Sequence, residues 1–184
     1  MTLNEVSNYR KLYGYYRTMA ERAIDQLNEN EFFWQPNNDS NSVAIIVNHL
    51  QGNMRSRWTD FLTTDGEKSW RERDREFEYP QLDKKALMAK WTNSWDVLFH
   101  AIDLIDDSNI DRTVYIRNQE HSIQEALSRQ LAHYASHVGQ IVYLSKMIKQ
   151  EGWKTLSIPK GASEQFNREK FSKGKHGGHF SDPS

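Results

Sequence analysis

The sequence lacks cysteine altogether and has no excess of charge of either sign, with a formal net charge of −1. Without cysteine, disulfides, thiolate nucleophiles and thiolate metal ligands are all excluded. Any bound metal must therefore be held by histidine nitrogens or by oxygen atoms. The balanced charge argues against a protein that binds nucleic acid by neutralising many phosphates.

Targeting and membrane signals are also missing. The first residues, Met1-Thr-Leu-Asn-Glu, lack the basic and then apolar segments of a signal peptide. No apolar run approaches the roughly 20 residues that a membrane-spanning helix needs. We therefore expect a cytoplasmic protein with neither a membrane nor a nucleic acid as its partner.

The sequence does contain enough large apolar side chains for one core. Six Trp, eight Tyr and eight Phe occur among 184 residues, and the 27% of charged residues predict a strongly polar surface. A chain of this length is most simply one domain.

Apolar residues recur at helical spacing in four stretches, which predicts four amphipathic helices. The first stretch, residues 9–27, should end before residue 37, because Pro36 disfavours helical geometry in the residue before it. The second begins near Ser42, a suitable N-cap residue, and extends to Phe61. The polar segment that follows, residues 63–80, is typical of a loop.

The third helix is expected to begin near Asp83. The fourth begins at Ser122, where Glu125 completes the spacing of a capping box, and Gly152 is a natural stop. Between these two helices, the β-branched run of residues 113–116 could form a short extended segment.

Four helices with one apolar face each can bury those faces by forming an all-α bundle. The long loop after the second helix makes its connectivity less regular than that of a simple up-down bundle. We place the bundle in residues 1–160. Residues 161–184 are rich in Lys, Gly, Ser and Asn, which predicts a flexible, disordered polar tail.

Three histidines are the most informative residues for function. His133 and His137 are four residues apart in the fourth helix, so their Cβ atoms lie roughly 5–6 Å apart on one face. His49 lies in the second helix, and all three fall at the border of an apolar stripe. Together they could supply three nitrogens to one divalent ion and leave a coordination position open, as in catalytic metal sites.

Two other interpretations apply to this spacing. A pair of histidines four apart also arises by chance, and border histidines often do no more than hydrogen-bond. The zinc-protease signature requires Glu after the first histidine, whereas this sequence has Tyr134 there, which argues against a metalloprotease.

Three segments resemble the DinB-like superfamily, which includes the bacillithiol-transferase-type proteins. They are Trp34-Gln-Pro, Ser42-Val-Ala-Ile-Ile-Val-Asn-His-Leu and His133-Tyr-Ala-Ser-His-Val-Gly-Gln-Ile. The segment Gly152-Trp-Lys-Thr-Leu-Ser-Ile-Pro-Lys-Gly resembles an uncharacterised subgroup. The resemblance implies a four-helix bundle, often dimeric. It also implies a zinc or nickel ion on three histidines, which correspond here to His49, His133 and His137.

The resemblance and the histidine pattern lead us to expect a divalent-metal-dependent enzyme of the thiol S-transferase or hydrolase type. Its substrate would be a small molecule, such as a thiol or a thiol conjugate, and its assembly a homodimer. No motif ties a carboxylate or hydroxyl to catalysis, so no catalytic residue is predicted. The alternative is a dimeric stress-response binding module whose metal is structural or absent.

Three residues near the histidines are candidates for substrate binding. Asn53 follows His49 by one turn, Gln130 lies within a turn of His133, and Arg57 lies further along the same edge, where it could attract an anionic group. Ordinary surface polarity, or a surface salt bridge for Arg57, is the competing interpretation.

Overall fold

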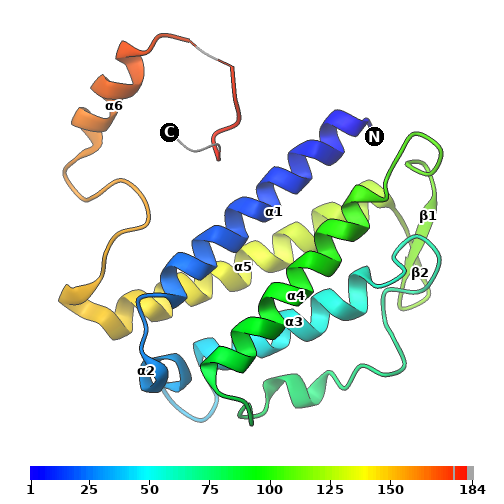
Figure 1. Ribbon diagram of the computed structural model, residues 1–184, viewed down its shortest axis with the longest axis horizontal. Coiled ribbons are helices and arrows are strands. Elements are labelled where there is room, and N and C mark those ends of the chain that lie inside the picture. The colour runs from blue at the N-terminus through cyan, green and yellow to red at the C-terminus, as the bar shows by residue number, and fades with distance from the viewer. Residues whose placement is uncertain (176, 182–184) are drawn as a thin grey trace.

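A computed structural model of the chain, which describes residues 1–175 and 177–181, is mainly helical with one small sheet (Figure 1). The expected all-α class is thus confirmed in its main feature. The helices, the 3-10 turns and the strands occupy these segments: α1 Leu3–Ile24, α2 Glu29–Phe33, α3 Val43–Trp58, η1 Asp74–Phe77, α4 Lys84–Asp103, β1 Thr113–Ile116, β2 Gln119–Ser122, α5 Ile123–Lys149, η2 Gln150–Gly152 and α6 Ser163–Ser172.

The four long helices pack against one another around a single core. Helix α1 contacts α5 and α4, and α3 contacts α4 and α5 (Figure 1). The largest fully buried side chains are aromatic and come from all four of these helices: Tyr13, Trp58, Trp91, Trp95 and Tyr134. Rings of this size bury large apolar areas and contribute most of the packing energy of such a core.

The helix starts predicted from capping residues are confirmed. The Ser42 hydroxyl accepts a hydrogen bond from the Ile45 N–H at 3.1 Å, and Asp83 caps α4 in the same way. Ser122 and Glu125 form the predicted capping box of α5. These side chains satisfy N–H groups that have no partner within the helix.

Two helix ends differ from the prediction. The first helix ends at Ile24, and a separate short helix, α2, follows because Asn28 provides a new N-cap with its own capping box. Helix α3 ends at Trp58 and not at Phe61, since Asp60 has a φ of 49°, which no α-helix accepts.

The β-branched segment forms the strand β1, as predicted, and pairs antiparallel with β2. The turn residues Arg117 and Asn118 have φ values of 55° and 59°, as in the tight turns that suit a hairpin. Their N–H groups both donate to the carboxylate of Asp65, at 2.8 and 2.7 Å. The hairpin is thereby tied to the loop between α3 and α4.

The tail differs from the expected disorder over residues 163–172, which form α6. Side chains four residues apart support this helix, namely Gln165 with Glu169 at 3.0 Å and Arg168 with Glu164 at 4.0 Å. None of its residues is buried, and residues 176 and 182–184 of the tail lie outside the described residues. Among the described residues, no helix is both long and apolar enough to cross a membrane.

Candidate metal centre

The structure brings together the three histidines that the sequence singles out. His49 comes from α3, and His133 and His137 come from α5. One ring nitrogen from each can be chosen so that all three lie within 4.8 Å of one another. The Nε2 atoms of His49 and His133 lie 3.4 Å apart.

A buried hydrogen-bonded group aligns the two helices next to this cluster. Tyr134, which follows His133, donates its hydroxyl proton to Asn53 Oδ1 at 3.0 Å. The same hydroxyl accepts from Trp58 Nε1 at 3.0 Å. Because Asn53 and Trp58 both belong to α3, these bonds fix how α3 and α5 lie relative to each other, and so where their histidines meet.

Hydrogen bonds at Nδ1 orient the imidazoles of His49 and His137. Glu76 Oε2 accepts from His49 Nδ1 at 2.9 Å, and Gln140 Oε1 accepts from His137 Nδ1 at 2.9 Å. The Phe77 ring stacks on His49 with 4.5 Å between centroids. An N–H engaged at Nδ1 leaves Nε2 with its lone pair, which is the state that a metal ligand requires.

These partners were missed at the sequence level. Gln140 lies three residues after His137, within one helical turn, so helical spacing could have found it. Glu76 lies 27 residues from His49 in an aperiodic loop, where no sequence pattern indicates a contact.

The surroundings of His133 and His137 favour the neutral form of both imidazoles. Burial, followed by the neighbouring His137 and His49, lowers the pKa of His133 from 6.5 to about 3. Burial also lowers the pKa of His137. Burial alone would raise the pKa of Glu76, but hydrogen bonds from Arg71 and His49 bring it below its ordinary value. At neutral pH His133 and His137 are thus uncharged, and neutral imidazole is the form that binds metal.

One separation in the cluster matches that expected for two nitrogens bound to the same divalent ion. In a tetrahedral site with metal–nitrogen bonds of about 2.0–2.1 Å, two ligand nitrogens lie about 3.3–3.4 Å apart. The separation of the Nε2 atoms of His49 and His133 matches that value. His49 is 4% exposed, whereas His133 and His137 are partly exposed, so solvent reaches the cluster at these two residues. Three ligands leave one tetrahedral position for another molecule.

The three candidate substrate-binding residues lie deeper than the sequence suggests. Asn53, Arg57 and Gln130 are 5%, 5% and 2% exposed, and Asn53 is bonded to Tyr134. Among the described residues, Nε and Nη1 of Arg57 and Oε1 of Gln130 have no hydrogen-bond partner. Solvated surface is therefore not their environment, and their role in substrate binding stays a prediction.

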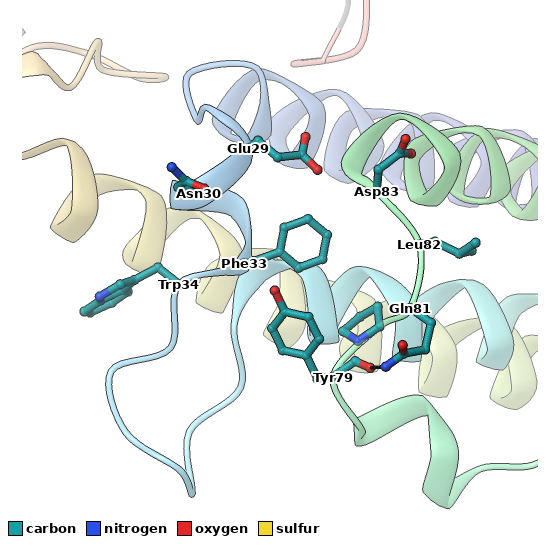
Figure 2. A pocket seen from close by; sticks show the side chains of 9 residues that line it. Glu29, Asn30, Phe33, Trp34, Tyr79, Gln81, Leu82 and Asp83 are labelled. Atoms are coloured by element: carbon teal, nitrogen blue, oxygen red, sulfur yellow. Dashed lines mark hydrogen bonds between the residues drawn. The ribbon is translucent and has the colours of Figure 1, made fainter.

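A cavity of about 490 Å³ lies elsewhere, between α2 and the start of α4 (Figure 2). The rings of Phe33 and Tyr79 lie 5.5 Å apart at its wall, and the carboxylates of Glu29 and Asp83 lie at the same opening. It shares no lining residue with the histidine cluster. The candidate metal centre is therefore a partly open site on the α3–α5 contact and not this cavity.

The chain belongs to a protein family whose description is "protein of unknown function (DUF1572)", which it matches over residues 2–162. All three histidines lie inside the matched region. No curated protein and no solved structure gives a significant match.

Proposed function

We propose that this protein is a divalent-metal-dependent enzyme of the thiol S-transferase or hydrolase type, built on a four-helix bundle of the DinB-like kind. The observation that carries the proposal is the histidine cluster, with three ring nitrogens within 4.8 Å of one another. The hydrogen bonds of Glu76 to His49 and of Gln140 to His137 support it, because they orient both rings.

A bound zinc or nickel ion would act as a Lewis acid that favours the anionic form of a thiol or of water at neutral pH. The residues of the chain have other tasks. Glu76 and Gln140 hold the protons of their histidines at Nδ1. Phe77 shields the ring of His49 from water, whereas the partial exposure of His133 and His137 leaves room for a small molecule to approach.

The substrate in this proposal is a small thiol or a thiol conjugate, and the assembly is a homodimer. Arg57 and Gln130 are buried with polar atoms that have no hydrogen-bond partner among the described residues, and a polar group of the substrate could supply one.

The first test is the metal content of purified protein without a tag. We expect about one zinc or nickel ion per chain in the wild type and none in His133→Ala. His100→Ala is the matched control, because His100 is exposed on α4 and does not belong to the cluster. Unchanged metal content in His133→Ala would refute the site.

The second test is activity. The metal-loaded protein is mixed with a thiol and an aryl chloride electrophile, and separately with a nitrophenyl ester. We expect one of the two reactions to exceed the rate of His133→Ala and to stop when the metal is chelated. If metal binds and chelation changes only the melting temperature, the binding module with a structural metal replaces the enzyme.

A further inference from the structure

Glu76 is a buried carboxylate, 7% exposed, in the turn η1 between α3 and α4. Arg71 donates a hydrogen bond to each carboxylate oxygen of Glu76, from Nε to Oε1 at 2.8 Å and from Nη2 to Oε2 at 2.9 Å. Arg71 is held in turn by Glu67, whose Oε2 accepts from Nη1 at 3.1 Å. Such a forked pair fixes a carboxylate in direction as well as in position.

The same carboxylate also contacts the histidine cluster. Glu76 Oε2 lies 2.9 Å from His49 Nδ1, while its neighbour Phe77 covers the face of the same ring. Two consecutive residues of η1 therefore contact one imidazole, one at its edge and one at its face. A turn whose only task was to close the loop would need neither contact.

The backbone of α3 is shaped to admit Glu76. A Cβ at position 52 would lie 2.3 Å from Glu76 Oε1, closer than real Cβ atoms come to an oxygen. Gly52 lies three residues after His49, and its lack of a side chain leaves space for the Glu76 carboxylate next to that histidine. Glycine in a helix interior lowers stability by about 0.5–1 kcal/mol relative to alanine, so the space for Glu76 is obtained at the expense of helix stability.

We propose that Glu76 is a positioning residue of the metal centre. Locked by Arg71, it holds His49 in the tautomer that carries its proton on Nδ1, so that Nε2 presents its lone pair to the ion. It also supplies one negative charge to a site whose direct ligands are neutral. This inference rests on the proposed metal site and adds a residue that does not itself touch the ion.

The three histidines then differ in how firmly they are set. His49 has a charged and buried partner, whereas the partner of His137 is the neutral amide of the exposed Gln140. Hydrogen bonds to charged groups are roughly twice as strong as those between neutral groups. We therefore expect substitution of Glu76 to weaken metal binding more than substitution of Gln140.

The test uses Glu76→Gln, which keeps the size of the side chain and removes its charge. An amide can donate to Nδ1 and so reverse the tautomer. We expect cobalt(II) and zinc to bind about 10–100-fold more weakly, which is the usual loss at such outer positions. The visible spectrum of the bound cobalt should change, and Glu76→Asp should recover part of the affinity.

The matched control is Glu72→Gln, in the same loop, whose partner is the exposed Arg75 at 3.1 Å. Its cobalt affinity and spectrum should equal those of the wild type. If Glu76→Gln also binds cobalt within twofold of the wild type with the same spectrum, Glu76 anchors the loop and nothing more.

A second measurement needs neither a variant nor a metal. Nitrogen NMR of the wild-type protein without metal reports which nitrogen of His49 carries the proton. We expect Nδ1, and a proton on Nε2 would overturn the inference even if Glu76→Gln failed to fold. A wild-type protein with the Nδ1 proton that binds no metal would instead refute the proposed function, and with it the role of Glu76.

Discussion

Replacing Gly52 with alanine should destabilise the protein, although alanine is the better helix former. The new Cβ would lie 2.3 Å from Oε1 and 2.7 Å from Cδ of Glu76. Both atoms belong to the carboxylate that Arg71 and His49 hold, so it can move aside only by giving up its hydrogen bonds.

Three contributions determine the expected change in the free energy of unfolding of Gly52→Ala. Alanine in a helix interior contributes about 0.5–1 kcal/mol of stability relative to glycine. Overpacking a tight site costs about 1–3 kcal/mol, and breaking a buried charge pair costs about 3–5 kcal/mol when one partner is left alone. Because Glu76 and Arg71 both remain in the variant and can partly re-pair, we expect a net loss of about 2–4 kcal/mol. For a chain of this size, that corresponds to a fall in melting temperature of about 4–16 °C.

Urea denaturation of metal-free protein measures this loss. Gly139→Ala in α5 is the matched control, since a Cβ there meets nothing within 4 Å, and it should raise stability by about 0.5–1 kcal/mol. In a Glu76→Ala background, Gly52→Ala should also become stabilising, because the obstructing carboxylate is gone. If Gly52→Ala stabilises the wild-type protein as much as Gly139→Ala does, the Glu76 carboxylate does not occupy the space next to Gly52.

Three further predictions concern His133, Tyr134 and Ser122. Burial lowers the pKa of His133 to about 3, so unfolding takes up a proton between pH 6.5 and 3. The metal-free protein should therefore lose stability as the pH falls through this range. Urea denaturation at a series of pH values should show a smaller loss in His133→Gln. Tyr134→Phe leaves Trp58 Nε1 and Asn53 Oδ1 without their buried partner, so urea denaturation should show a loss of about 1–3 kcal/mol, and an unchanged midpoint would contradict this account. Ser122→Ala removes the cap of α5 and should cost about 1 kcal/mol by the same assay, whereas Ser122→Asn should restore most of it.

Features that depend on neighbours in the chain could be predicted from the sequence. A capping residue acts on an N–H two or three positions away, so Ser42, Asp83 and Ser122 mark their helix starts correctly. The pair His133 and His137 shares a face because four residues make about one helical turn.

Contacts between distant segments could not be predicted in this way. The sequence of the loop 63–80 has no periodicity. Its path is set by the ion pairs of Arg71 with Glu67 and Glu76, and by the hydrogen bonds that Asp65 accepts from the hairpin. The burial of Arg57 likewise depends on that loop, whose Gly66 lies against the guanidinium.

The amino-acid sequence by itself therefore determined a mainly helical chain, the starts of its helices and three histidines suited to one ion. Only the tertiary structure decided that α3 and α5 bring those histidines within 4.8 Å, and that Glu76 stands behind His49. The reason is physical: helix geometry is set by bonds over three or four residues, whereas the site depends on how packed helices and a charged loop meet.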